Sequence, residues 1–321
     1  MAGISCKICG NKSFSYLYKG IDRFCFVEGD YDLYKCDKCG LIIILPYLQQ
    51  DILKKYYPDN YYSYSDTNRM QEDIGSVKDK LIFYLKHPIK AANCIMYSKI
   101  LKQKDCLTYK KDLNILDIGC GDGRYLLEKR KYGCNCFGVD INKEALDKLK
   151  KADPNMVVYC GNLWEAKFPD NHFDVVNLSS VLEHIVDIDT LLLEINRILK
   201  KSGVLRIHVP NSRSLTYKIF GKYWMGLDVP RHVYTFSINN LKLLFKKVNF
   251  KVGSYRTVEN SYDFICSIIY VYNSIFKKKC EIMKCSNVWD NELLKLLFSP
   301  YAFLVNALKV GDSVEFVLKK E

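Results

Sequence analysis

Long apolar runs are absent from this sequence of 321 residues. The three longest, at 41–45, 264–276 and 293–308, are short or are interrupted by polar residues or by a proline. A membrane-spanning helix needs about 20 consecutive apolar residues, so none of the three predicts one. We expect the last two to be buried faces of helices, with contact to a membrane surface as the alternative.

The opening residues do not predict a secretory leader. The opening residues MAGISCKICGNK contain neither the basic stretch nor the apolar stretch of such a leader. We therefore expect a cytoplasmic protein in a reducing compartment, where paired cysteines hold metal more often than they form disulfides.

The composition excludes a long disordered chain. Hydrophobic residues make up 49% of the sequence, which is enough to bury a sizeable core. The net charge of +12 comes from 48 basic and 36 acidic residues, and the basic ones are scattered along the chain. Such scatter favours ordinary solvated surface over a basic face that meets phosphate or an anionic surface. The length favours one main domain with a smaller appendage.

Changes in periodicity divide the chain into three parts. Residues 1–48 hold two Cys-x-x-Cys pairs, and residues 49–110, which begin with a Tyr-rich stretch, are predicted to form a helical linker or arm. Residues 111–321 form the third part, in which strand and helix patterns alternate. No internal repeat beyond the doubled cysteine pair and no low-complexity tract is present.

The third part predicts an α/β fold with a mainly parallel sheet covered by helices on both faces. Strands are expected at NILDIGC, NCFGVDI, MVVYCGN, FDVVNLSS and GVLRIHVP, with helices from Arg124, from Lys143 and over TLLLEINRILKK. An irregular insertion at 212–236, a helix at about 238–248 and a strand near 250–258 follow. The remainder is expected to be helical, at about 260–309, until a final edge strand at 313–319.

Two cysteine pairs predict a metal site. Cys6 and Cys9, like Cys36 and Cys39, follow a C-x2-C spacing with glycine directly after each pair. Two such knuckles supply four thiolates, which complete a tetrahedral structural zinc site and leave no open position. A disulfide or redox pair is the alternative, but redox chemistry requires neither the glycines nor two copies. The remaining cysteines are expected to be small buried side chains, including Cys120, Cys134, Cys136 and Cys160.

A glycine-rich turn predicts a nucleotide site. Strand residues lead into Asp117, Gly119, Gly121 and Gly123 and then directly into a helix. Glycine lets the backbone take positive φ and approach a ligand, and the free amides favour a carboxylate or phosphate. Asp140 ends the next strand, where it can accept hydrogen bonds from two ribose hydroxyls. The G-x-G-x-G spacing differs from the G-x-G-x-x-G of dinucleotide sites and favours a compact ligand with an amino-acid tail.

The segments "LDIGCGDG", "GVDIN", "LEH" and "EINRILKKSGVLRIHVPN", in this order, resemble the class I S-adenosylmethionine-dependent methyltransferases. The resemblance runs from residue 114 to about 250 and implies a Rossmann-like seven-stranded sheet. It implies that the glycines and Cys120 bound the methionine end of S-adenosylmethionine, that Asp117 orients its amino-acid part, and that Asp140 and Ile141 hold the ribose. It also places Asn162 and Leu163 beside the adenine. The family commonly has Asp where this chain has Asn162, whose amide oxygen can still accept a hydrogen bond.

The acceptor side is expected at the carboxyl end of the sheet. Glu183 and His184 follow the fourth strand, where the resemblance places residues against cofactor and acceptor. The alternative is a helix-start acid and a structural histidine.

The insertion FGKYWMGLDVPRHVYTFS resembles a methyltransferase subfamily that acts on surface glycans and small metabolites, in which W-x-G-L-D-x-P-R-H covers the acceptor pocket. Trp224, Arg231 and His232 are therefore expected to contact the acceptor. The alternative is that Arg231 and His232 cap the following helix or pair with nearby carboxylates. His184 and His232 are the expected general bases, because imidazole titrates near neutral pH; His87, His172 and His208 lack such a context.

The resemblance extends to the N-terminal part. The same subfamily has members with an N-terminal zinc ribbon followed by a proline and a YY motif, matched here by CGLIIILP and KYYPDNYY. We therefore expect an enzyme that uses S-adenosylmethionine and structural zinc to methylate a small molecule or sugar, at oxygen before nitrogen or carbon. A zinc-ribbon RNA methyltransferase is the first alternative, although no Asn-Pro-Pro-aromatic signature follows the fourth strand. A non-catalytic cofactor-binding protein is the second. The acceptor and the oligomeric state stay open.

Overall fold

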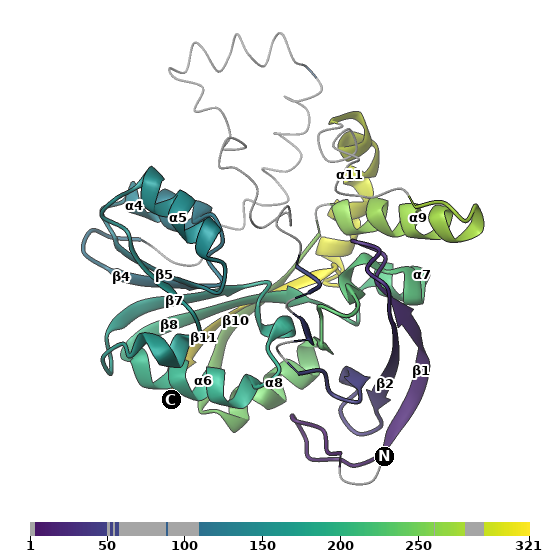
Figure 1. The fold of residues 1–321 in the computed structure, drawn as a ribbon, viewed down its shortest axis with the longest axis horizontal. Coiled ribbons are helices and arrows are strands. Elements are labelled where there is room, and N and C mark those ends of the chain that lie inside the picture. The colour runs from purple at the N-terminus through teal and green to yellow at the C-terminus, as the bar shows by residue number, and fades with distance from the viewer. Residues whose placement is uncertain are drawn as a thin grey trace.

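The computed structural model in Figure 1 describes residues 4–49, 52–53, 55–57, 88, 109–259, 261–279 and 292–321. The expected linker at 49–110 falls almost entirely outside these residues, as do His87, the KYYPDNYY motif beyond Tyr57 and part of the expected helical insertion. The strands of the described residues form two sheets, one of seven strands and one of four.

The larger sheet has the strand order β10-β11-β8-β7-β4-β5-β6. Its first five strands along the chain are β4 (Asn114–Ile118), β5 (Asn135–Asp140), β6 (Val157–Cys160), β7 (Phe173–Ser179) and β8 (Leu199–Pro210). These five pair in parallel, whereas β11 (Ser313–Lys320) pairs antiparallel with both β8 and β10 (Phe250–Val258). This is the seven-stranded, mainly parallel sheet that the sequence resemblance implied, and it confirms the expected fold class.

Helices cover both faces of this sheet, with α4 (Arg124–Arg130) and α5 (Lys143–Ala152) on one face and α6 (Ile188–Ile198) and α8 (Ile238–Lys247) on the other (Figure 1). Successive side chains of a strand point to opposite faces. Ile115 of β4 accordingly packs with Leu126 of α4 and Leu149 of α5, whereas Leu116 belongs to the core shared with α6 and α8. The alternating pattern therefore predicted these layers correctly.

The expected edge position of the last strand was wrong, because β11 lies between β8 and β10. Its residues Val314, Phe316 and Leu318 are completely buried, and Phe316 packs edge-on against Phe245 of α8. Its polar residue Glu315 is only 4% exposed because it accepts from Arg206 of β8 at 2.7 Å and from Arg256 of β10 at 3.2 Å. Ion pairs with arginines of both neighbouring strands thus allow the charged Glu315 to be buried in the interior of the sheet.

The smaller sheet is antiparallel and joins the N-terminal part to the insertion. It comprises β1 (Phe14–Ile21), β2 (Asp30–Cys36), β3 (Ile42–Leu45) and β9 (Tyr234–Thr235), in that order. Because β9 comes from the insertion, two segments almost 200 residues apart in the chain share one sheet. The side chains of Ile43 and Tyr234 also belong to the same apolar core as Leu116, so the two sheets pack as one body.

The insertion and the C-terminal part add short helices. They are α7 (Leu215–Phe220), α9 (Tyr262–Ile275), α11 (Glu292–Ala307) and 3-10 turns at 221–223 and 225–227. Two further 3-10 turns, at 163–166 and 182–184, follow β6 and β7. Helix α9 buries Ile265 and Tyr270 but leaves Ile275 exposed, and α11 buries Val305 but leaves Leu297 exposed. The expected buried faces are thus confirmed for one side of each helix. Within the described part of the chain, we find no helix whose length and hydropathy would let it cross a bilayer.

Candidate active site

A glycine elbow connects β4 to α4 at the carboxyl edge of the larger sheet. Gly119 and Gly123 have φ values of +69° and +78°, which side-chain-bearing residues rarely adopt. A β-carbon on Gly119 would lie 2.4 Å from a methyl group of Val181, and one on Gly123 would lie 2.4 Å from a methyl group of Leu149. Glycine therefore fits best at these two positions, where the elbow packs closely against Val181 and Leu149.

Asp140, the last residue of β5, lies against this elbow. Its two carboxylate oxygens accept hydrogen bonds of 2.8 Å from the backbone N–H groups of Gly121 and Asn142. The residue is 8% exposed, and burial raises the pKa of its carboxyl group although the backbone donors oppose that rise. Asp140 is thus turned toward the elbow and away from bulk solvent.

Asp117 is a buried acid on β4, directly before the elbow. It is 5% exposed, and one of its oxygens accepts a hydrogen bond of 2.7 Å from the side-chain amide of Asn177 on β7. Burial raises its pKa to about 7, and the Asn177 hydrogen bond offsets this only in part. A ligand cation at this position would restore the charge of the carboxylate, because an opposite charge favours the ionised form.

The end of β6 lies beside the end of β5, where Cys160 pairs with Asp140. The expectation that Cys160 is buried was wrong, because it is exposed at the tip of an edge strand with a neighbour on only one side. Asn162 starts the 3-10 turn at 163–166, and its backbone N–H donates to Glu165 at 2.8 Å. Leu163 is 2% exposed, whereas Ile141 is 52% exposed.

Glu183, His184 and His232 come together at the same edge. The backbone oxygen of Glu183 accepts from the N–H of Val233 at 2.9 Å, which fixes the turn after β7 against the insertion. The two imidazole rings lie 4.6 Å apart between centroids, and Nε2 of His232 lies 3.8 Å from Oε1 of Glu183. The structure therefore unites three residues that the sequence placed in two separate motifs.

Burial decides the charge of this cluster. It raises the pKa of Glu183 to about 8 and lowers the pKa of His184 to about 3, where the neighbouring His232 adds to the effect. The pKa of His232 is lowered for the same reason. Both imidazoles are thus neutral at pH 7.

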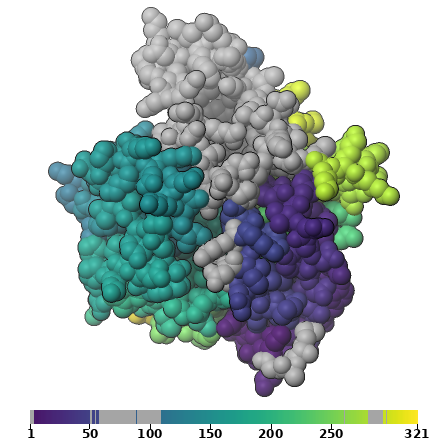
Figure 2. Space-filling view, in the orientation of Figure 1, coloured from purple at the N-terminus to yellow at the C-terminus, as the bar shows by residue number. Residues whose placement is uncertain are grey.

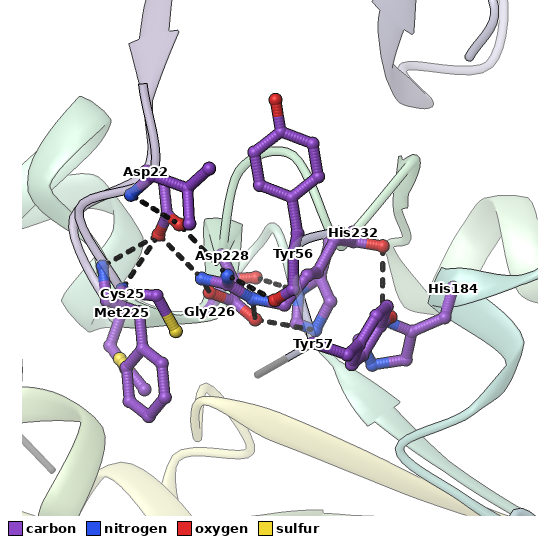
Figure 3. Close-up of polar contacts among 12 residues, drawn as sticks. Asp22, Cys25, Tyr56, Tyr57, His184, Met225, Gly226, Asp228 and His232 are labelled. Atoms are coloured by element: carbon purple, nitrogen blue, oxygen red, sulfur yellow. Dashed lines mark hydrogen bonds and ion pairs between the residues drawn. The ribbon is translucent and has the colours of Figure 1, made fainter. Parts of the chain in front are cut away.

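Arg231 is completely buried and joins the N-terminal part to the insertion. Its guanidinium donates to both carboxylate oxygens of Asp22, at 3.1 and 2.8 Å, and to both of Asp228, at 2.9 and 2.5 Å. Figure 3 shows Asp22 and Asp228 converging from the two segments. The backbone carbonyl of Arg231 meanwhile accepts from Nδ1 of His184 at 3.0 Å. Sequence reasoning missed Asp22, because nothing local marks an acid whose partner lies 209 residues away.

Trp224 lies in the same seam. It is 1% exposed, packs against Tyr217 with ring centroids 5.2 Å apart, and belongs to a cluster with Leu33 and Ile44 of the N-terminal sheet. Both Trp224 and Arg231 are thus enclosed by protein in this structure, and their contact with an acceptor stays a prediction.

A hollow of about 310 Å³ lies between the N-terminal part and the end of α9. Arg23 and Lys277–Lys279 line it together with Ile21 and Tyr270, so its charge favours an anionic group. Figure 2 shows the two segments side by side, in purple and yellow-green. None of the elbow residues lines it.

The four cysteines of the N-terminal part form one cluster. Sγ of Cys6 lies 3.6 Å from Sγ of Cys39, Sγ of Cys9 lies 3.6 Å from Sγ of Cys36, and all four lie within 4.8 Å of one another. Two thiolates that bind one zinc ion at about 2.3 Å in a tetrahedron lie roughly 3.8 Å apart, so the spacing fits zinc. The hydrogen bond between Cys6 and Cys39 lowers the pKa of Cys6 to about 5 and raises the pKa of Cys39, so one sulfur of this pair is the thiolate and the other donates.

Comparison with known proteins agrees with this geometry. The family model described as "Methyltransferase domain" matches residues 83–255, more than half of the chain and all of the elbow and cluster residues described above from β4 onward.

The two relatives and the solved structure described next are 19–29% identical to this chain in the matched regions. An uncharacterized protein of Methanocaldococcus jannaschii is 28% identical over 229 residues, which are 69% of this chain and 89% of that protein. A ubiquinone biosynthesis O-methyltransferase of Pelagibacter ubique is 29% identical over 110 residues, which are 33% of this chain and 46% of that protein. The chain thus spans less than half the length of that enzyme. The solved structure of phosphoethanolamine N-methyltransferase 2 from Haemonchus contortus with S-adenosyl-L-methionine is 19% identical, with a TM-score of 0.48, over 87% of this chain and 61% of that one.

The seam around Arg231 generates a stability prediction. Asp22→Ala leaves the guanidinium buried with only one of its two carboxylates, and breaking a buried ion pair costs about 3–5 kcal/mol. Asp30→Ala is the matched control, since Asp30 pairs with Lys19 on the surface of the same sheet, where a pair contributes at most about 1 kcal/mol. Urea denaturation measures both variants, and equal losses in the free energy of unfolding would contradict the role given to Arg231.

Proposed function

We propose that this chain methylates a hydroxyl oxygen of a small molecule or sugar, for example in the biosynthesis of surface glycans. The chain belongs to the family of class I S-adenosylmethionine-dependent methyltransferases. The observation that carries the proposal is the glycine elbow with Asp140 bonded to its backbone and Asp117 buried beside it. The named O-methyltransferase among the relatives supports oxygen as the methylated atom.

The residues of the elbow fit S-adenosylmethionine. Gly119, Gly121 and Gly123, with Cys120, would surround its methionine end, since all three glycines have positive φ and form the turn between β4 and α4. Asp117 would face its ammonium group, whose positive charge would favour the ionised form of this buried acid. Asp140 and Ile141 would hold the ribose, Asn162 and Leu163 the adenine, and Glu183 the rim toward the acceptor. When bound, this group supplies a methyl group on a positively charged sulfur.

The chain itself has to position the acceptor, exclude water and take up the acceptor's proton. His184 and His232 are proposed for the proton, since Nδ1 of each lies within hydrogen-bond distance of a backbone carbonyl, Arg231 for one and Gly226 for the other. A carbonyl can only accept, so Nδ1 of His232 carries the hydrogen and its Nε2 keeps a free electron pair. Nδ1 of His184 contacts both the carbonyl of Arg231 and, at 2.8 Å, the hydroxyl of Tyr57. In the tautomer that bonds the carbonyl, the Tyr57 oxygen accepts from the same Nδ1 and Nε2 is free. Trp224 and Arg231 are proposed to contact the acceptor from the seam.

We further propose that Cys6, Cys9, Cys36 and Cys39 hold a structural zinc ion. Four thiols within 4.8 Å of one another match the donor set and spacing of a closed zinc site. The ion would fix two loops of the smaller sheet, the one before β1 and the one between β2 and β3.

The affinity for S-adenosylmethionine should depend on pH through Asp117. Its pKa of about 7 means that the carboxyl group loses its proton as the pH rises, and only the charged form pairs with the ligand's ammonium group. Calorimetric titration should show affinity rising from pH 5 to 7, up to about tenfold per pH unit, because one proton is released on binding.

Asp117→Asn should bind at least tenfold more weakly at pH 7 and lose the pH dependence, whereas Asp30→Asn on the surface should change neither. Wild-type protein should also transfer labelled methyl groups to hydroxyl compounds. No binding of S-adenosylmethionine at any pH would refute the proposal.

The zinc proposal is tested by metal analysis of purified protein. Cys36→Ser should lose one equivalent of zinc per chain and unfold at lower urea concentration, because the binding free energy of a structural zinc is part of the folding free energy. Cys160→Ser, at an exposed thiol, should keep both the zinc and the stability. Equal zinc content in both variants would count against the site.

A further inference from the structure

Glu183 is a buried carboxyl group without a described partner. It is 1% exposed, and among the residues that the structure describes none donates a hydrogen bond to either carboxylate oxygen. A buried polar group that lacks a hydrogen bond costs about 1–3 kcal/mol, more when it is charged, so native proteins rarely keep one without a ligand or a function. The carboxyl group of Glu183 is therefore a candidate for binding a ligand.

Two imidazoles offer electron pairs beside these oxygens. The carbonyl of Gly226 lies 2.9 Å from Nδ1 of His232 and that of Arg231 lies 3.0 Å from Nδ1 of His184, and a carbonyl requires the hydrogen on the nitrogen. The hydroxyl of Tyr57, 2.8 Å from the same Nδ1 of His184, then accepts as well, and Nε2 of each ring is the atom with a free electron pair. Imidazoles that bind metals are held in this way, with the other ring nitrogen donating to a carbonyl or carboxylate. The neighbouring residues therefore fix both rings in the form that ligates a metal ion.

The distances suit a single ion. One ligand atom from each of Glu183, His184 and His232 lies within 4.8 Å of the others, and the pair from Glu183 and His232 is separated by 3.8 Å. Nitrogen and oxygen ligands bind such ions at about 2.0–2.2 Å, so two of them are at most roughly 4.4 Å apart. A small side-chain movement brings all three within reach of one ion.

We propose that Glu183, His184 and His232 bind one divalent transition-metal ion, separate from the four-cysteine site. Two imidazoles and one carboxylate suit ions such as Zn²⁺, Mn²⁺ or Fe²⁺ better than Mg²⁺ or Ca²⁺, which prefer oxygen ligands. Three protein ligands leave coordination positions open for a further oxygen. The ion would stand at the carboxyl edge of the sheet, between the elbow and the insertion.

The use of the ion rests on the proposed function. An acceptor hydroxyl bound at an open position becomes more acidic and loses its proton to water. Its oxygen then forms the new C–O bond while the C–S bond breaks and its electron pair stays on sulfur. Because Nε2 of both imidazoles would then be a metal ligand, the ion would take over the role of the histidine base proposed above, and water would take up the proton.

Binding of Mn²⁺ tests the site in the full chain, with the cysteine-bound metal left in place. Free Mn²⁺ gives an electron paramagnetic resonance signal that disappears on binding, so titration measures the number of ions bound. We expect one Mn²⁺ per chain, and at least tenfold weaker binding in both Glu183→Gln and His232→Gln. His172→Gln, at the opposite end of β7, is the control and should bind like the wild type.

Two variants at different positions separate loss of a ligand from loss of folding, and circular dichroism checks that each is folded. Absence of Mn²⁺ binding up to about 1 mM, or unchanged binding in folded Glu183→Gln and His232→Gln, overturns the site and returns the cluster to acid-base chemistry without metal. The same samples are titrated with S-adenosylmethionine. If the protein binds S-adenosylmethionine but does not bind Mn²⁺, the metal site alone is refuted. If it binds Mn²⁺ but does not bind S-adenosylmethionine, the proposed function alone is refuted.

Discussion

The buried guanidinium of Arg231 is the interaction on which the candidate active site depends. It satisfies two carboxylates, Asp22 from the N-terminal part and Asp228 from the insertion, that would otherwise be buried charges without a counter-ion. Its own carbonyl sets the ring orientation of His184, and the next residue, His232, reaches the same place. The N-terminal part is therefore more than an appendage, because it holds the insertion in the position that completes the cluster.

The rest of the site follows from the parallel sheet. Strands β4, β5 and β7 end at one edge, so the elbow, Asp140 and the turn with Glu183 lie side by side although they come from separate segments. The acids there differ in surroundings. Asp140 receives two backbone hydrogen bonds, Asp117 receives one from an amide, and Glu183 has no described hydrogen bond to its side chain. Asp140, whose two oxygens already accept backbone hydrogen bonds, suits neutral hydroxyl groups, whereas Asp117 and Glu183 suit a cation.

The sequence predicted what depends on local pattern. The buried strands, the amphipathic α6 and the glycine elbow have periodicities and turn residues that leave few alternatives, and the structure confirms them. It could not predict what depends on distant partners. The strand at 313–319 was expected at an edge, because the two arginine partners of Glu315 lie on other strands, and Asp22 was not singled out because Arg231 is distant in the chain. Cys160 was misjudged because its strand is apolar in sequence but lies at an edge. The pairing of β3 with β9 was likewise invisible, since two residues form no recognisable strand pattern.

The central claim is that the elbow and the two acids beside it form the cofactor site. A crystal structure of the protein grown with S-adenosylhomocysteine, the demethylated product, tests this most directly. The account predicts the amino-acid end of that molecule at Gly119–Gly123 beside Asp117 and its ribose hydroxyls on the carboxylate of Asp140. Density for the molecule in the basic hollow lined by Arg23 and Lys277, with the elbow unchanged and unliganded, would contradict it.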